Sequence, residues 1–329
     1  MKNTTIRDVA RVAGVSISSV SRYLKEPSSI NPIAAIAVRD AIKELNYVPN
    51  PFAQNLKKES NNVIAVLLPD ISHSFFARTC RSLEKIFYQN NYLMMICDTD
   101  DDPQKEQFYI EEMLKTRAAG IMIASSGNNA EYLKKMVEEH RHIMLYDRAV
   151  EGVKANLVCE NNREAGVQLT EHMIEKGCRS FAVIGGNRQS SNAQLRLEGI
   201  REACERNGVR LEENFVYQDV SEWEDVEKAV REMLDHPHRP DCLITCNPRL
   251  TDSVVVAANK LHLKLPEQLQ LCGFTIDDPR QIYAVPMCAM CQDPYQVGLK
   301  AGEMMLRMLK NKTKSRTVKQ TFLPMKLYD

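Results

Sequence analysis

Residues 4–24 read TTIRDVARVAGVSISSVSRYL, and this segment restricts the possible folds and functions more than any other. Its apolar residues recur at the spacing of one helix face: Ile6, Val9, Ala10 and Ala13. Gly14 follows, where a helix end and a tight turn favour a residue that tolerates a positive φ. Ser16 can then cap a second helix. Two short helices joined by a turn with glycine predict a helix-turn-helix, whose second helix enters the major groove of DNA.

A third helix is expected to complete a small core. Asn31 is a favourable N-cap and Pro32 a favourable first helical residue. An apolar stripe follows, made of Ala35, Val38, Ile42 and Leu45. The alternative is an ordinary helical hairpin at a domain edge, because many short helices share this spacing. The agreement between Gly14, Ser16, Arg22 and the Asn31-Pro32 start favours a helix-turn-helix head.

Composition and charge fit a soluble globular protein with a basic head. The 329 residues suggest two or three domains, and 44% hydrophobic with 26% charged residues is typical of globular chains. The net charge is zero, yet residues 1–60 hold nine Lys or Arg and only five Asp or Glu. The head therefore carries +4 and the remainder −4. Such an asymmetry indicates that the head alone meets phosphate.

We expect a cytoplasmic protein. Residues 2–5 lead directly into the first helix and not into the apolar stretch of a secretory signal. The apolar run at residues 63–68 is too short to span a bilayer, so no membrane association is expected.

The cysteines are expected to be free and to bind no metal. The chain has ten, and a large cytosolic chain argues against disulfides. The close pairs are Cys242 with Cys246 and Cys288 with Cys291, and a zinc site would need four ligands at suitable spacing. Both pairs lie in strand-like apolar runs, where cysteine acts as a small hydrophobe.

A short segment after the third helix suits a hinge. Pro49 and Pro51 break that helix, Asn50 can cap a new one, and residues 52–56 can form one or two turns. A helix this short is unstable alone in water, so it would need packing, a second copy of itself, or DNA. A polar linker follows it.

From Val63 onwards, short apolar strands alternate with amphipathic helices. Strands are expected at 63–69, 92–100, 120–124, 142–147, 157–161, 180–186, 215–217, 241–246 and 269–274. Helices are expected at about 75–90, 104–116, 130–139, 163–176, 192–207, 222–235 and 251–262. The alternation predicts two α/β lobes with doubly wound parallel sheets. Ligands bind such sheets beyond the carboxyl ends of the strands, so a cleft between the lobes is the natural effector site.

These features together resemble the LacI/GalR family, named for the lactose and galactose repressors. The resemblance is carried by TIRDVARVAGVSISSVSRYL, the Asn31-Pro32 start, ELNYVPNPFAQNL (44–56), VLLPDISHSFFA (66–77), CGF (272–274) and QDPYQVGLKAGEMML (292–306). It implies a transcriptional repressor that binds a pseudo-palindromic DNA operator as a homodimer, sometimes a tetramer. A small-molecule effector, such as a sugar or sugar derivative, would modulate its operator affinity.

The resemblance also implies a domain plan. The helix-turn-helix head would occupy residues 1–49, the hinge helix and linker 50–60, and a core like periplasmic sugar-binding proteins 61–329. Three crossings between the lobes are expected near 160–163, 290–293 and 321–324. The N-lobe would then contain about 61–160 and 292–321, and the C-lobe about 161–291 and 322–329.

Candidate DNA-binding residues follow from the same resemblance. Ile17, Ser18 and Arg22 match the base-reading positions, and arginine can bind guanine through two hydrogen bonds. Phosphate contacts or caps are expected of Thr5, Ser16, Ser19, Ser21 and Asn31, although capping alone would explain Ser16 and Asn31. In the hinge, Leu56 matches a leucine that wedges into the minor groove. Asn50 would begin that helix, Ala53 would let two hinge helices approach, and Lys57 would reach the groove edge.

The candidate effector residues match the family less completely. Asp147, Arg196 and Asn247 occupy positions of polar ligand contacts, and Phe76 and Gln292 are expected in the wall. Thr275, also assigned to the site, stands where the family often has a ligand-binding Asp. Pro248 replaces the Asp after Asn247, and Ser74 replaces a usual Pro. An acidic or modified sugar, a purine-like ligand or no small effector therefore stay open, as does a purely structural pairing of Arg196 with Asp147.

An enzyme is not expected. The sequence has no GxGxxG motif after a strand, no P-loop and no HExxH motif, and it suggests no catalytic residue or cofactor. The acidic run at residues 98–102 is more typical of a solvated turn with a helix cap. Two alternatives to the effector-controlled regulator remain: a solute-binding receptor with the same core, and a regulator controlled by a protein partner.

Overall fold

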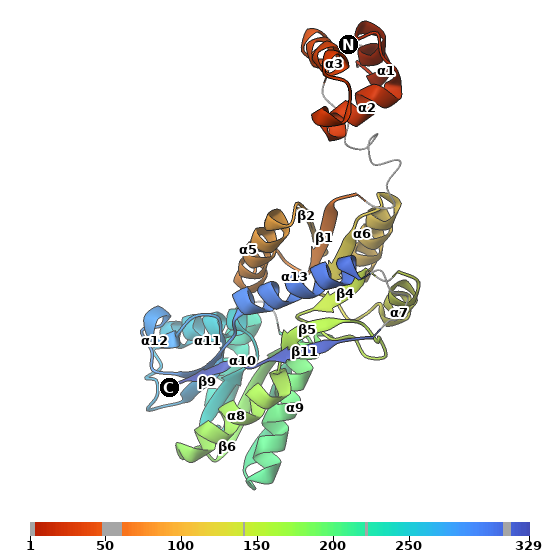
Figure 1. The fold of residues 1–329 in the computed structure, drawn as a ribbon. Coiled ribbons are helices and arrows are strands. Elements are labelled where there is room, and N and C mark those ends of the chain that lie inside the picture. Colours follow the sequence, from red (N-terminus) through yellow and green to blue (C-terminus); the bar gives the residue numbers. More distant parts are fainter. Residues whose placement is uncertain (1–3, 48–60, 141, 221–222, 312–316) are drawn as a thin grey trace. The chain divides into compact units, whose positions relative to one another are not determined.

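The computed structural model describes residues 4–47, 61–140, 142–220, 223–311 and 317–329 (Figure 1). The chain divides into two compact units, one up to Asn61 and one from Asn62 to Asp329. These units are the head and the core. No helix in the described ranges is both long and apolar enough to cross a membrane.

The head contains the three expected helices and one short 3-10 helix. Its elements are α1 (Ile6–Val12), α2 (Ile17–Lys25), η1 (Pro27–Ser29) and α3 (Pro32–Glu44). Its centre is formed by Val9, Ala10, Val20, Val38 and Ala41. Ala41 is buried, although it was not part of the expected apolar stripe on α3. Ala35 was part of that stripe but is only partly buried. Gly14 has a φ of +64°, as the turn between α1 and α2 requires.

The first core sheet defines the N-lobe. Its order is β11-β5-β4-β3-β1-β2, all parallel. The strands are β1 (Val63–Leu68), β2 (Leu93–Asp98), β3 (Gly120–Ile123), β4 (Ile143–Tyr146), β5 (Leu157–Glu160) and β11 (Gln320–Leu323). Helices α5 (Ser74–Gln89) and α13 (Pro294–Lys310) cover one face, and α6 (Pro103–Lys115) and α7 (Ala130–Glu139) cover the other (Figure 1).

The second sheet defines the C-lobe. Its order is β12-β10-β9-β8-β6-β7, parallel except for β12. The strands are β6 (Ser180–Gly186), β7 (Arg210–Gln218), β8 (Cys242–Thr245), β9 (Gln270–Thr275), β10 (Cys288–Cys291) and β12 (Lys326–Tyr328). Helices α8 (Asn162–Glu175) and α9 (Ser191–Arg206) cover one face, while α10 (Trp223–Asp235) and α11 (Pro248–Lys260) cover the other. A short helix, α12 (Pro279–Ile282), follows β9.

The chain passes between the lobes three times. The first crossing is at Asn161, between β5 and α8, and the second is at Gln292 and Asp293, between β10 and α13. Both lie where they were expected. The third follows Leu323 and so also lies within the expected range of 321–324. The N-lobe nevertheless reaches two residues beyond the boundary expected at 321, because β11 pairs with β5 up to Leu323, which lies opposite Glu160.

Three further differences from the expected elements have local causes. Helix α11 begins at Pro248 and not near 251, since Asn247 caps it and Pro248 takes the first helical position. Strand β7 starts at Arg210 and not at 215, because its polar first half also pairs with β6. A register shift separates this first part of the pairing from the second. Strands β11 and β12 were not anticipated, because none of their residues is buried and no apolar run marks them.

Candidate functional site

Helix α2 presents a polar, exposed face of the head. Ser16 starts the helix, since its Oγ accepts a hydrogen bond from the Ser19 amide at 3.1 Å. Val20 faces inward and is fully buried. The predicted DNA-facing residues Ile17, Ser18, Ser21 and Arg22 are all exposed. Within residues 4–47 no acceptor holds the Arg22 guanidinium, so its donors can serve a molecule outside the head.

The other predicted anchors of the head cap its helices. Thr5 and Asp8 form a reciprocal capping box, in which the Thr5 amide donates to the Asp8 carboxylate at 3.0 Å. Asn31 Oδ1 accepts from the Ile33 amide at 2.9 Å at the start of α3. The capping roles are confirmed, and phosphate contacts of these exposed residues remain a prediction.

The predicted hinge residues Asn50, Ala53, Leu56 and Lys57 lie outside the described residues. The structure therefore neither supports nor opposes the hinge helix, which remains a proposal from the sequence.

A cavity of about 210 Å³ lies between the two lobes of the core. Its walls come from the carboxyl ends of strands in both sheets, where ligands bind in doubly wound folds. Five of the six predicted effector residues line it, namely Phe76, Asp147, Arg196, Asn247 and Gln292. The structure thus brings these five residues together around one cavity, and their contact with an effector remains a prediction.

Thr275 does not line this cavity. Its side chain is buried, and its hydroxyl donates to the backbone oxygen of Asp277 at 2.9 Å. The same hydroxyl lies 3.0 Å from the Cys291 sulfur. The hydrogen-bonding capacity of Thr275 is therefore used inside the C-lobe, so its assignment to the effector site was wrong.

Arg196 is the most informative side chain in the cavity. It is 2% exposed, and its Nε donates to Asn162 Oδ1 at 2.7 Å while Nη1 donates to the Cys246 oxygen at 2.6 Å. The guanidinium lies 4.0 Å from the centre of the Phe274 ring. Its Nη2 is buried and has no partner among the described residues. A buried donor without an acceptor is costly, so this atom calls for an acceptor from a bound molecule.

Asp147 provides a complementary acceptor. It follows β4 with a φ of +61° and is 4% exposed. Its Oδ1 accepts from Asn192 Nδ2 at 3.1 Å, and its Oδ2 lies 3.7 Å from Arg148 Nε. Burial raises the pKa of this carboxyl above its ordinary value. Asp147 and Arg196 do not bind each other directly; Asn192 and Asn162, joined at 3.0 Å, stand between them. A direct structural pairing of Arg196 with Asp147 is therefore not the arrangement found.

Glu160 links the cavity to the crossings between the lobes. Its Oε2 accepts from Gln292 Nε2 at 2.6 Å, and its Oε1 accepts from the Asp293 amide at 2.8 Å. These contacts join the first crossing to the second. Burial raises the pKa of Glu160 to about 7.

Two glycines bring α8 and α9 close enough to place Arg196. A Cβ on Gly166 would lie 2.4 Å from the Arg196 carbonyl oxygen, and one on Gly199 would lie 2.1 Å from the Arg163 carbonyl oxygen. Only glycine allows these backbones to approach so closely.

Among the described residues, two charged pairs join the lobes, and one of them, Arg249 with Asp70, lines the cavity. Arg78 on α5 binds Asp277 after β9 through two hydrogen bonds of 2.6 and 2.7 Å. Arg249 on α11 lies 4.0 Å from Asp70 after β1. Each pair joins one lobe to the other and so favours the present angle between them.

Several residues of this site were missed by sequence reasoning. They are the cavity-lining residues Asp70, His73, Asp101, Arg148, Asn192 and Arg249, together with Glu160 and Asn162 behind them. A scan for polar residues directly after each predicted strand would have found Asp70, Asp101, Arg148 and Asn162. Asn192 has no such signal, because its role depends on how α9 is packed.

Two family models match the chain. The model described as "Bacterial regulatory proteins, lacI family" matches residues 5–50, and the model described as "Periplasmic binding proteins and sugar binding domain of LacI family" matches residues 61–328. The first covers the helix-turn-helix head, and the second covers both lobes of the core.

Relatives and solved structures agree with these matches. The HTH-type transcriptional repressor PurR of Vibrio atlanticus is 25% identical over 95% of this chain and 94% of its own length. The ribose operon repressor of Halalkalibacterium halodurans is 29% identical over 94% and 91%. A Lac repressor dimer bound to operator and the anti-inducer ONPF has a TM-score of 0.80 at 19% identity, covering 100% of this chain and 98% of that one. A complex of the regulator CelR with cellobiose has a TM-score of 0.72 at 20% identity, covering 99% and 98%.

Proposed function

This chain belongs to the LacI family of bacterial regulatory proteins, and from that membership we propose a ligand-controlled transcriptional repressor. It binds a pseudo-palindromic operator as a homodimer, and a small molecule between the lobes changes its operator affinity. It acts in the cytoplasm, where its DNA is, and by binding alone, without catalysis.

The buried, unpartnered Nη2 of Arg196 is the observation that carries the ligand part of this proposal. A donor of this kind gains a hydrogen bond only when a ligand supplies the acceptor. The Asp147 carboxylate and the Phe76 ring stand in the same cavity. A ligand with hydroxyl donors, oxygen acceptors and one apolar face would satisfy all three, which favours a sugar or sugar derivative.

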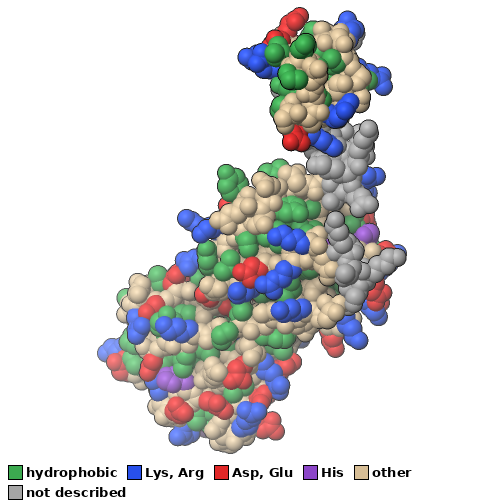
Figure 2. Space-filling view, viewed as in Figure 1, with side chains coloured by type: hydrophobic (Ala, Val, Ile, Leu, Met, Phe, Trp, Pro, Cys, Tyr) green, Lys and Arg blue, Asp and Glu red, His purple; other side chains and the backbone are tan. Residues whose placement is uncertain are grey.

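The open edge of the N-lobe sheet supports the homodimer. Strand β2 is last in its sheet, and its Leu93, Met95 and Ile96 are 62%, 43% and 43% exposed. Figure 2 shows hydrophobic side chains on the surface of the N-lobe, among acidic and basic ones that are spread over both lobes. Exposed apolar side chains on the outermost strand of a sheet, whose outer edge pairs with no described strand, favour association with a second protein surface.

The ligand would control operator affinity by changing the angle between the lobes. A ligand that binds one angle better than another shifts the population toward it, and by no more than its difference in affinity. In a dimer this change would alter the distance between the two hinge segments, and with it their folding on DNA. Leu56 would then act as the wedge in the minor groove.

Two experiments test the proposal in sequence. Selection from random DNA with the full-length chain should enrich a pseudo-palindrome, and a chain lacking residues 1–60 should enrich nothing. If the truncated chain retained the full function, the solute-binding receptor would be the better account.

A thermal-shift screen against sugars, sugar acids and nucleobases then addresses the effector. A ligand bound only by the folded state raises the melting temperature. If every compound failed while operator binding was intact, control by a protein partner would replace the small-ligand account.

A further inference from the structure

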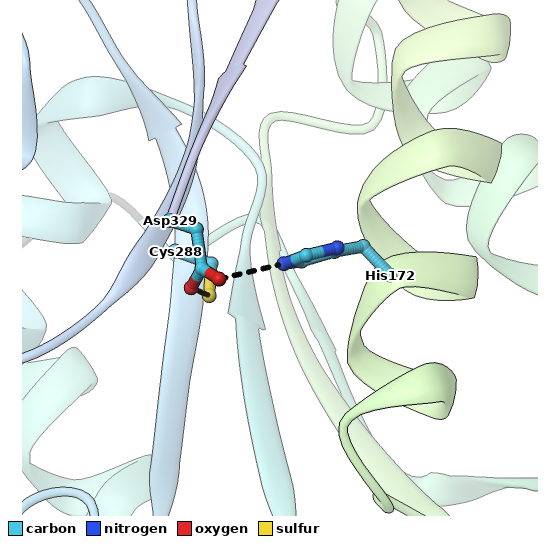
Figure 3. Close-up of side chains that lie close together, drawn as sticks. All are labelled: His172, Cys288 and Asp329. Atoms are coloured by element: carbon cyan, nitrogen blue, oxygen red, sulfur yellow. Dashed lines mark hydrogen bonds and ion pairs between the residues drawn. The ribbon is translucent and has the colours of Figure 1, made fainter.

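Three donor side chains from distant parts of the sequence meet at the end of the C-lobe away from the effector cavity. His172 lies on α8, Cys288 begins β10, and Asp329 follows β12. Figure 3 shows the imidazole of His172 directed at the Asp329 carboxylate, with the Cys288 sulfur beside the same group. The Cys288 thiol donates to Asp329 Oδ1 at 3.1 Å, and His172 Nε2 lies 3.6 Å from Asp329 Oδ2.

We propose that His172, Cys288 and Asp329 form a metal-binding site of the zinc type. The donor atoms of the three residues all lie within 4.8 Å of one another. Zinc bonds of roughly 2.0–2.3 Å to sulfur, nitrogen and oxygen hold tetrahedral ligands about 3.3–3.8 Å apart. Small side-chain movements would therefore give three ligands and leave a fourth position for water.

The hydrogen bonding of His172 also supports a metal-binding site. Its Nε2 is buried and has no hydrogen-bond partner among the described residues; the Asp329 oxygen is its nearest charged neighbour. A metal ion would satisfy this nitrogen together with the thiolate and the carboxylate. Calcium and magnesium prefer oxygen ligands alone, whereas a sulfur, nitrogen and oxygen set suits zinc or cobalt.

An ion can reach this site, although one neighbouring charge opposes it. Cys288 and Asp329 line a second cavity, of about 400 Å³, which gives access from the solvent. Lys176, which also lines it, contacts Asp329 Oδ1. Its ammonium repels a cation, yet it leaves Oδ2, the oxygen nearer His172, available as the ligand.

This site could not be predicted from the sequence, because its three residues are far apart along the chain. Neither Cys242 with Cys246 nor Cys288 with Cys291 forms a pair of ligands, and only Cys288 takes part. The bound ion would join α8, β10 and the end of the strand after the third crossing, so metal binding should stabilise the C-lobe.

Titration of the metal-free full-length chain with Co²⁺ and Zn²⁺ tests the proposal. We expect one cobalt ion per chain, with a sulfur-to-cobalt charge-transfer band, and displacement by zinc. Cys288→Ser should abolish that band. His172→Gln should weaken zinc binding by more than about 100-fold. Loss of a residue that only hydrogen-bonds to a metal ligand costs up to about 100-fold, so a larger loss would identify His172 as a ligand itself. Zinc should also raise the melting temperature of the wild type and not that of His172→Gln.

Two further variants distinguish this site from metal binding elsewhere on the surface. His238→Gln removes an exposed histidine near His236, which could hold metal by chance, and should leave the sulfur-to-cobalt band unchanged. Lys176→Gln should strengthen zinc binding by roughly threefold to tenfold, because one nearby positive charge is gone. The proposal is overturned if wild-type cobalt shows no sulfur band, if His172→Gln binds zinc like the wild type, or if Lys176→Gln binds it more weakly.

Discussion

Glu160 lies at the first crossing between the lobes, and its carboxyl group is held by partners on the second crossing. Burial raises its pKa to about 7, from an ordinary value of 4.5. The folded state therefore holds this proton more tightly than the unfolded state does. The resulting stability is fully present below about pH 4.5 and is lost as the pH rises through about 7.

Glu160→Gln should remove this pH dependence. The amide imitates the protonated acid: its oxygen can accept from the Asp293 amide, and its NH₂ can donate to Gln292 if that side chain turns over. The variant should match the wild type at low pH and exceed it at high pH by up to about 3 kcal/mol in free energy of unfolding. Urea midpoints of both proteins at pH 5 and pH 8 would measure the difference.

The matched control is Glu164→Gln, which changes an exposed glutamate on α8. Its stability difference from the wild type should be equal at the two pH values. If Glu160→Gln also differed from the wild type by the same amount at both, the buried carboxyl would not be the cause.

Some of the site residues could be predicted individually, because their positions depend only on the neighbouring residues in the sequence. Asp147 ends an apolar strand, and such positions face the cleft in doubly wound folds. Thr275 also ends a strand, yet its hydroxyl turns to the Asp277 backbone, because Asp277 follows in a turn that the sequence pattern does not specify. Asn192 could not be predicted, since its contacts depend on the close packing of α8 and α9.

At the scale of elements, helix α2 combines one buried residue with an exposed polar face. The periodicity predicted this helix, its cap and its buried Val20, because all three depend on neighbours within a few residues. The same periodicity did not predict β11 or β12. Strand β11 pairs with β5, more than a hundred residues earlier, and β12 pairs with β10, about forty residues earlier.

Arg22→Ala should separate specific from non-specific DNA binding. Loss of a bidentate base contact should cost about 1–3 kcal/mol on the selected operator and little on random DNA. Fluorescence anisotropy on both DNAs at fixed salt would measure this. Arg39→Ala, an exposed arginine on α3, is the matched control and should affect both DNAs equally or not at all. Equal losses for Arg22→Ala would make Arg22 a phosphate contact.

At the scale of the whole core, the paired charges of Arg78 and Asp277 favour one angle between the lobes. Their side chains are 47% and 42% exposed, so water screens the attraction, and such pairs contribute about 0–1 kcal/mol. Because the pair joins α5 to the C-lobe, even this small energy changes the balance between lobe angles. The two-lobed plan was predictable from the alternation of strands and helices, whereas the pairs across the cleft were not.

Arg78→Ala should weaken the binding of a ligand that contacts both lobes. The dissociation constant should rise by twofold to about fivefold, the equivalent of up to about 1 kcal/mol. Asp277→Ala should have the same effect, and the double variant no larger one, because both remove a single interaction. Arg81→Ala, an exposed arginine on α5, should leave the constant unchanged. Additive effects in the double variant, measured by calorimetry, would contradict a shared contact.

We propose that a ligand between the lobes controls operator binding, and substitutions at three residues test this directly. Arg196→Ala removes the unpartnered donor, but also the contacts to Asn162 and Cys246. Asp147→Asn removes the acceptor with almost no change of shape. The exposed Asp100→Asn, outside the cavity lining, is the matched control.

The decisive measurement is operator affinity as a function of ligand concentration for the wild type and these variants. Ligand should change wild-type and Asp100→Asn operator affinity by about 5-fold to 150-fold, the usual range of coupling between sites. Arg196→Ala and Asp147→Asn should bind operator with unchanged affinity in the absence of ligand and should not respond to it. An unchanged ligand response in both pocket variants would contradict the account, as would a wild type that binds ligand with no effect on operator affinity.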